Sequence, residues 1–142
     1  MPAFQLDPRI AAASVAVADL ALCHVRLQDD RRWPWLVLVP RRPDLVELDD
    51  LSETERSQVM REISLTGEAV RVVGAALGRD VHKLNTGALG NVVSQLHIHV
   101  VGRRRDDPAW PGPVWGFGAT DPLEPEARQV AVAAAASILT GS

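Results

Sequence analysis

Residues 95–101 read Gln-Leu-His-Ile-His-Val-Val, a pattern that predicts an amphipathic strand with one chemically distinct face. Side chains of a strand alternate between its two faces. Gln95, His97 and His99 are therefore expected on one face, while the apolar side chains between them can face a core. The polar face would carry an amide and two imidazoles, with successive positions on it about 7 Å apart.

A glycine-rich segment lies just upstream of this strand. Residues 87–91 read Gly-Ala-Leu-Gly-Asn, and in a hairpin they would sit at the end of the histidine strand. Glycine permits close backbone approach, and exposed backbone N–H groups bind anions. Imidazoles beside such a loop indicate phosphate chemistry.

The histidine pair alone leaves three interpretations open. Both rings can be hydrogen-bonded strand residues without a chemical role. They can share a metal ion, although the candidate third ligands Cys23, His24 and His82 show no recognisable ligand spacing. Finally, one histidine can act at phosphorus as a nucleophile or an acid–base group.

The rest of the chain predicts an α+β domain with helices on an antiparallel sheet. A polar turn at 29–32 separates two expected strands, and a capping-box pattern begins at Ser52. We expect an ordered loop over 106–118 and a solvated end to the last strand at Arg103–Arg105. The expected strands are 19–28, 33–40, 81–86 and 92–103, and the expected helices are 52–77 and 124–139.

Composition limits the possible functions. The chain has 142 residues with 46% hydrophobic content and a net charge of −3, which predicts one domain over 1–142 and excludes extensive disorder and nucleic-acid binding by bulk charge. The apolar run at 11–17 is too short to cross a membrane, and no signal-like segment opens the sequence. A lone cysteine, Cys23, fits a reducing compartment, so we expect a cytoplasmic protein.

Several segments together resemble the histidine triad (HIT) family. That family has a His-φ-His-φ-His-φ-φ signature, where φ is apolar, preceded by an Asn-x-Gly strand end and a Gly-Gln-Ser/Thr-Val loop. Similar segments here are Asn85–Gly87, Gly90–Val93 and Gln95–Val101. Leu36–Arg42 resembles the family's Val-Ile-Pro-Lys strand, and Trp110–Gly112 resembles the tail of one branch.

The resemblance implies a HIT-like α+β fold, a mainly antiparallel sheet of about five strands with two main helices. It implies a homodimer that cleaves the α-phosphate linkage of dinucleoside polyphosphates, such as diadenosine polyphosphates, or of nucleoside phosphoramidates. His97 would form the nucleotidyl-histidine intermediate, and His99 would orient the site and contact the phosphate. Asn85 and the loop residues Gly90, Asn91 and Val92 would bind the nucleotide. No metal or other cofactor, nucleic acid or membrane is expected to take part.

Departures from the family pattern leave a second function open. Gln95 stands where the first histidine belongs, and its amide can donate a hydrogen bond to a phosphate oxygen or to the leaving group but cannot titrate. Pro43 and Val92 replace further polar family residues. We therefore keep as alternatives a catalytically reduced nucleotide-binding protein and, third, a metal-binding strand protein. Asp29 or Asp30 lies near the position of the family's ribose-binding Asp.

Overall fold

The computed structural model describes residues 3–141. Its sheet has five strands, all paired antiparallel, in the order β1-β2-β3-β5-β4. The strands are β1 (Ser14–Asp19), β2 (Cys23–Gln28), β3 (Trp35–Pro40), β4 (Lys83–Gly87) and β5 (Ile98–Arg103). The helices are α1 (Pro8–Ala12), α2 (Glu53–Ala76) and α3 (Pro125–Thr140), with a short 3-10 turn at Leu48–Asp50. The predicted fold class, with two main helices, is confirmed.

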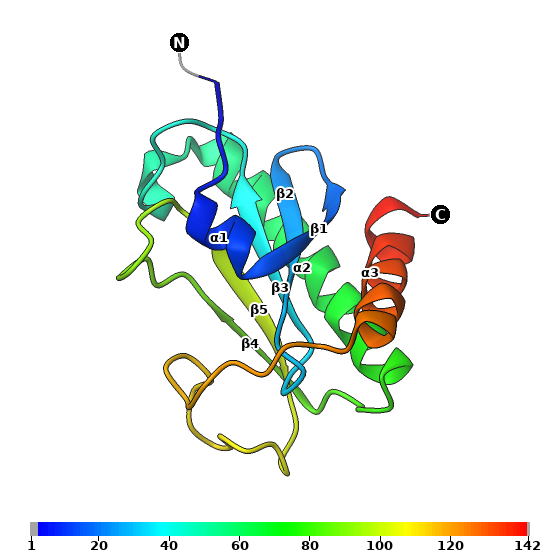
Figure 1. The fold of residues 1–142 in the computed structure, drawn as a ribbon. Coiled ribbons are helices and arrows are strands. Elements are labelled where there is room, and N and C mark those ends of the chain that lie inside the picture. The colour runs from blue at the N-terminus through cyan, green and yellow to red at the C-terminus, as the bar shows by residue number, and fades with distance from the viewer. Residues whose placement is uncertain (1–2, 142) are drawn as a thin grey trace.

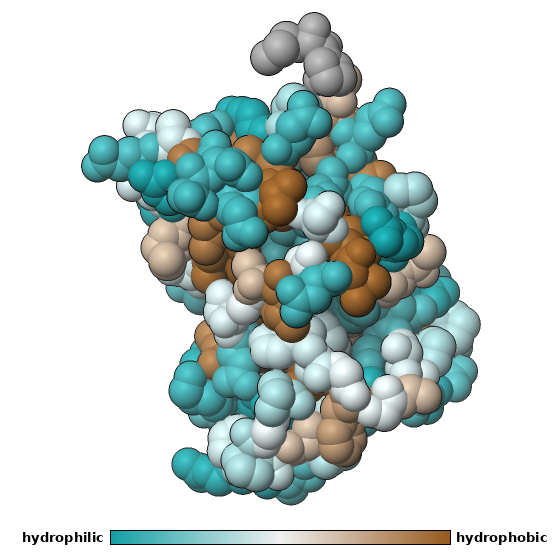
Figure 2. All heavy atoms as spheres, turned by 90° about the vertical axis from the view of Figure 1, so that its left-hand side faces the viewer, coloured by the Kyte–Doolittle hydropathy of each residue, from teal (hydrophilic) through white to brown (hydrophobic). Residues whose placement is uncertain are grey.

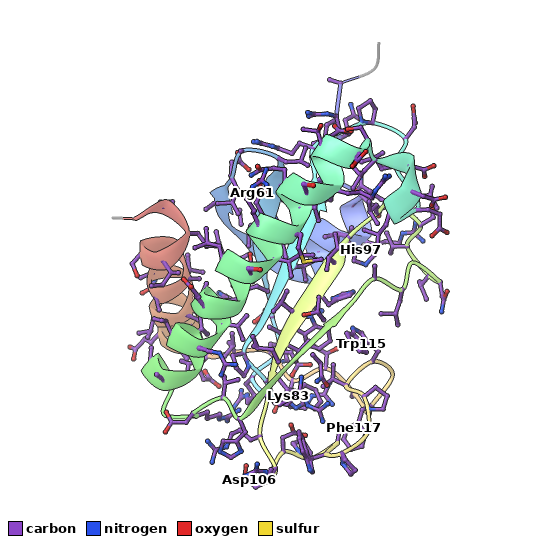
Figure 3. All side chains as sticks on the ribbon, turned by 180° about the vertical axis from the view of Figure 1, so that it is seen from behind. Arg61, Lys83, His97, Asp106, Trp115 and Phe117 are labelled. Atoms are coloured by element: carbon purple, nitrogen blue, oxygen red, sulfur yellow. The ribbon has the colours of Figure 1, made fainter. Side chains whose placement is uncertain are left out.

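The two faces of the sheet are covered differently. Helices α2 and α3 pack on one face, where Leu36, Leu38 and Val100 are buried with their apolar side chains (Figures 1 and 3). The opposite face carries a second buried cluster beneath α1 and the loop after β5: Ile10, Trp33, Trp35, Val37, Val39, Val101 and Val114. No helix within residues 3–141 combines the length and the apolar character needed to cross a bilayer.

Helix α2 begins where the sequence predicts and also fixes a strand. The Ser52 hydroxyl accepts a hydrogen bond from the Glu55 backbone N–H (3.2 Å), and the Glu55 carboxylate accepts one from the Ser52 N–H (3.0 Å). Two turns further on, the Glu62 carboxylate is buried and accepts hydrogen bonds from the backbone N–H groups of Leu22 (3.0 Å) and Cys23 (2.7 Å). The helix thereby holds the backbone where β2 starts.

The prediction of one strand over 19–28 is wrong. The chain bends at residues 20–22, where the Leu20 N–H donates to the Cys23 carbonyl (2.8 Å), and two antiparallel strands result. The earlier strand, β1, falls in an alanine-rich segment that carried no strand prediction. The bend is stable because Glu62 pairs with the backbone groups that a continuous strand would place in the sheet.

The strand predicted over 92–103 is shorter than expected. Strand β5 begins at Ile98, and its neighbour β4 ends at Gly87, which pairs with His99. Beyond that pair the backbone has other partners: the Leu96 N–H donates to the Leu45 carbonyl at 2.9 Å. His97 therefore lies in the irregular segment immediately before the strand.

Arg103 contradicts the prediction of a solvated strand end. Its side chain is 1% exposed and donates to the Asp107 carboxylate at 2.8 and 3.0 Å. Although burial raises the pKa of Asp107, hydrogen bonds from Arg103 and from the Arg104 backbone lower it to about 2. A buried arginine is tolerated here because its charge is paired and its N–H groups are bonded.

Candidate functional site

The two motif histidines lie side by side at the start of β5. Figure 3 labels His97 there. Their ring centroids are 4.9 Å apart with an interplanar angle of 72°. His99 is placed by the sheet, where it pairs with Val37 of β3 and Gly87 of β4. His97 is placed by its neighbours Leu96 and Ile98, which are buried on the helix side. The sequence prediction that both rings share a face is confirmed by this contact.

Hydrogen bonds fix which ring nitrogen carries the proton in each neutral histidine. His97 Nδ1 lies 2.6 Å from the Gln95 carbonyl oxygen, which can only accept, so Nδ1 donates and Nε2 keeps its lone pair. The Trp35 indole N–H donates to His99 Nδ1 at 3.0 Å, so the proton of His99 is on Nε2. The pair therefore offers one nucleophilic nitrogen and one hydrogen-bond donor.

The surroundings of His99 keep it neutral. Burial and the neighbouring His97 lower the pKa of His99 from 6.5 to about 4. Burial acts here because Trp35 and Trp115 pack edge-on to the ring, with centroids at 5.6 and 5.7 Å. At neutral pH, His99 is consequently a donor without a net charge.

A cavity of about 380 Å³ opens beside both rings. Its wall combines the histidines and Trp115 with the glycine-rich loop, including Gly90, Asn91 and Val92. The loop turns at Gly90, whose φ of +71° is readily accessible only to glycine. Neither this cavity nor the smaller hollow next to His97 is lined by a lysine or arginine within residues 3–141. An anion in the larger cavity would therefore meet the loop and the imidazoles, whereas the smaller hollow also carries the carboxylates of Glu47 and Asp49.

The mouth of the site is apolar. Val92 is 82% exposed and Leu89 is 44% exposed. Figure 2, which views the molecule from the left-hand side of Figure 1, shows hydrophobic side chains interrupting a mainly hydrophilic surface. Val46 and Leu48, which line the smaller hollow of about 140 Å³, are also exposed.

Gln95 has partners that the sequence did not predict. Its Oε1 accepts a hydrogen bond from the Asp7 backbone N–H, and its Nε2 donates to the Gln5 carbonyl, both at 2.8 Å. Nearby, the Arg9 guanidinium donates to the Val92 carbonyl at 3.2 Å. The N-terminal segment (residues 5–9) thus contacts Val92 and Gln95, the two ends of the stretch 92–95 that precedes His97.

Other candidate binding residues have internal partners. Asn85 is on β4, and its Oδ1 accepts a hydrogen bond from Arg103 at 2.8 Å. Asp29 accepts one from the Leu123 N–H at 3.0 Å. Asp30 is 2% exposed and pairs with Arg32 at 2.8 Å. The structure therefore does not bring these side chains into the wall of the cavity beside the histidines.

The proposed metal ligands lie apart. His24 contacts Asp19 at 2.7 Å near the β1 edge, and His82 accepts from the Arg105 N–H at 3.1 Å. Cys23 is buried on the helix side of the sheet, where burial and Glu62 raise the pKa of its thiol. Across residues 3–141 no group of three or more His, Cys, Asp or Glu residues is arranged to hold a metal ion. The metal interpretation gains no support.

A larger hollow of about 470 Å³ lies elsewhere, around Arg79 and Pro108. Three of its arginines are held by carboxylates, Arg31 by Asp121, Arg32 by Asp30 and Arg104 by Asp106. Because its described lining contains no histidine, cysteine or serine, it offers no nucleophile of the kind found at His97. The histidine pair therefore remains the candidate functional site.

Two main helices pack on a five-stranded antiparallel sheet, and a histidine pair lies beside a glycine-rich loop. These features define the class of protein, an α+β protein with a site built on two imidazoles. The family model described as the HIT domain matches residues 10–106, and the chain belongs to the HIT family. Membership of this family supports a nucleotide-binding or hydrolase function.

Solved structures extend the likeness to nearly the whole chain. A HIT protein from Sinorhizobium meliloti is 42% identical, with 96% of this chain and 97% of that chain covered and a TM-score of 0.86. A histidine triad protein from Bradyrhizobium japonicum is 39% identical (97% and 99% covered, TM-score 0.90). One from Marinobacter aquaeolei is 36% identical (99% and 98% covered, TM-score 0.89). No match was found among curated proteins.

Proposed function

We propose that this chain is a nucleotide hydrolase or transferase that cleaves the α-phosphate linkage of a dinucleoside polyphosphate or nucleoside phosphoramidate. The observation that carries the proposal is the hydrogen bond from His97 Nδ1 to the Gln95 carbonyl. It leaves Nε2 of a neutral imidazole unprotonated, which is the form a nucleophile needs.

The reaction would run in two displacements. In the first, the lone pair of His97 Nε2 attacks the α-phosphorus, a P–N bond forms, and the bond to the leaving group breaks. The leaving group departs with its bonding electrons and takes up a proton from solvent. In the second, water attacks the same phosphorus, a P–O bond forms, and the P–N bond breaks with its electrons returning to His97 Nε2. The attacking water loses a proton to solvent, and the nucleoside monophosphate and the free imidazole are released. Dividing the displacement in this way lowers each barrier.

His99 and the loop would stabilise the phosphate during both steps. The Nε2–H of His99 is oriented by the Trp35 hydrogen bond and lies next to the ring of His97. Backbone N–H groups around Gly90 can add further donors without a metal ion. Donors held rigidly before reaction stabilise developing charge with little reorganisation.

The proposal is tested by product release and by trapping. Purified protein is mixed with diadenosine tetraphosphate or with adenosine 5′-phosphoramidate, and AMP is quantified for wild type and His97→Ala. AMP release that disappears in the variant, together with an adenylylated wild-type protein after acid-free quenching, supports the proposal. Equal rates in the two proteins would refute it.

A nucleotide-binding protein without turnover is the second candidate function. The observation that favours it is that the side chains of Gln95 and Asn85 are already hydrogen-bonded inside the protein. Fewer groups are then free to stabilise a transition state. AMP binding by calorimetry, without AMP release from either substrate, would favour this candidate over the enzyme.

The oligomeric state and the compartment that we propose rest on the family and on the Cys23 thiol. We propose a homodimer in a reducing cytoplasm, acting on a small nucleotide. The buried thiol of Cys23, with its raised pKa, is consistent with a protein that needs no disulfide. Sedimentation velocity would test the dimer, because a monomer of 15.4 kDa and its dimer separate clearly.

A further inference from the structure

We propose that Gln95 is a positioning residue, which ties the N-terminal segment (residues 5–9) to the peptide that orients His97 and does not contact the phosphate. This inference rests on the proposed function for its kinetic consequence. Its structural part, the effect of Gln95 on the protonation form of His97, holds in the absence of any substrate.

Both polar atoms of the Gln95 side chain are hydrogen-bonded to the backbone of the N-terminal segment. Oε1 accepts from the Asp7 N–H and Nε2 donates to the Gln5 carbonyl, each at 2.8 Å. The bond to the Gln5 carbonyl uses one of the two N–H donors on Nε2 and, with the bond from Asp7, fixes where the carboxamide lies. These two bonds are made to backbone groups 88 and 90 residues away in sequence, so they fix a long-range contact rather than a local turn.

The backbone carbonyl of Gln95 orients the ring of His97. The Gln95 carbonyl accepts the proton of His97 Nδ1 at 2.6 Å. Its direction depends on the peptide between Gln95 and Leu96, which is held by the Gln95 side chain on one side and by the Leu45 carbonyl on the other. Loss of the side-chain bonds leaves this peptide held by the hydrogen bond to the Leu45 carbonyl alone, so that the Gln95 carbonyl can tilt away from Nδ1 and the imidazole can change tautomer.

A second contact of the N-terminal segment acts at the other end of the same stretch. Arg9 donates to the Val92 carbonyl at 3.2 Å, and its guanidinium is held in place by the Asp7 carboxylate at 3.1 Å. Residues 92–95 are therefore held at both ends by one short segment. This arrangement gives a stretch without strand pairing a defined position before His97.

The first test is spectroscopic and needs no substrate. Long-range ¹H–¹⁵N correlation spectra report the tautomer of each of the four histidines, and His97→Ala identifies the signal of His97. Wild type is expected to show His97 protonated on Nδ1 alone. Gln95→Met, which keeps the side-chain length without hydrogen bonds, and Gln95→Asn, whose amide is too short to reach both partners, are expected to show a mixture of tautomers.

The matched control is Gln5→Ala. Gln5 takes part through its backbone carbonyl, so the substitution removes the same type of side chain from the same segment and keeps the hydrogen bond. Its tautomer signature and its rate of AMP release should equal those of wild type. Melting temperatures of all variants are measured alongside, so that the comparison is made on folded protein.

The second test separates positioning from contact with the leaving group. With adenosine 5′-phosphoramidate the leaving amine needs a proton, whereas a 4-nitrophenyl ester of AMP releases a stable anion. A misplaced nucleophile slows both reactions equally, so Gln95→Met should lower kcat about tenfold for each, with KM nearly unchanged. A donor to the leaving group would instead give a much larger loss with the amine.

Two results would overturn the inference. One is a His97 signal that stays protonated on Nδ1 alone in both Gln95 variants. The other is a loss of activity that differs several-fold between the two substrates, which would assign Gln95 a direct contact. If wild type releases no AMP from either substrate, the proposed function fails, while the tautomer measurement still decides whether Gln95 positions His97.

Discussion

Trp35→Phe should raise the pKa of His99. The indole N–H of Trp35 donates to His99 Nδ1 at 3.0 Å, and that bond exists only while Nδ1 is unprotonated. It therefore stabilises the neutral ring. A hydrogen bond of this kind contributes about 0.5–1.5 kcal/mol, and one pKa unit corresponds to about 1.4 kcal/mol. The pKa of His99, about 4 in the wild type, should rise by roughly half a unit to one unit in the variant.

The measurement is an NMR titration of the His99 ring proton in wild type and variant. Trp33→Phe is the matched control. Trp33 belongs to the same buried cluster as Trp35, with 6.2 Å between their ring centroids, but it makes no hydrogen bond to His99. The control should leave the titration midpoint within about 0.2 units, less than the contribution of a single hydrogen bond. A midpoint that stays put or falls in Trp35→Phe would refute the assigned tautomer and with it the donor role of His99.

Three further predictions concern stability. Glu62→Ala should lower the free energy of unfolding by about 3 kcal/mol, because it leaves two buried backbone N–H groups unpaired; urea denaturation checks this, with the exposed Glu68→Ala as control. Arg103→Lys should cost about 2 kcal/mol, because an ammonium cannot replace the two-pronged contact to Asp107, whereas Arg105→Lys on the surface should be neutral. The free energy of unfolding should also fall, by at most about 3 kcal/mol, as the pH drops from 6.5 towards 4, because the unfolded state takes up a proton that folded His99 excludes. His99→Asn should flatten that part of the pH profile of stability, and an unchanged slope in the variant would contradict this prediction.

The histidine motif was predictable because its pattern is local. Alternation of polar and apolar residues through residues 95–101 places both imidazoles on one face, and the glycines upstream indicate a loop beside them. The strand boundary was not predictable in the same way. The start of β5 depends on where β4 ends and on the hydrogen bond from the Leu96 N–H to the Leu45 carbonyl. Both are tertiary contacts, which a local pattern does not report.

The environment of the histidines was harder to predict. The contacts of Gln95 join residues about 90 positions apart, and no periodicity in the sequence reports such a pair. Trp35 lies in the expected strand 33–40 and is buried, but its N–H also orients His99, which the strand pattern does not indicate. Arg103 was assigned to solvent because a run of arginines usually is exposed, whereas Asp107 four residues later makes its burial possible.

The tryptophans around His99 also give the protein a built-in optical signal. The chain has four tryptophans and no tyrosine, so its ultraviolet emission comes from indole rings. Two of them, Trp35 and Trp115, lie within 6 Å of His99 between ring centroids. Since a protonated imidazole quenches indole fluorescence, the emission should follow the charge of His99. The unlabelled protein can thus report on its own site in a stopped-flow instrument.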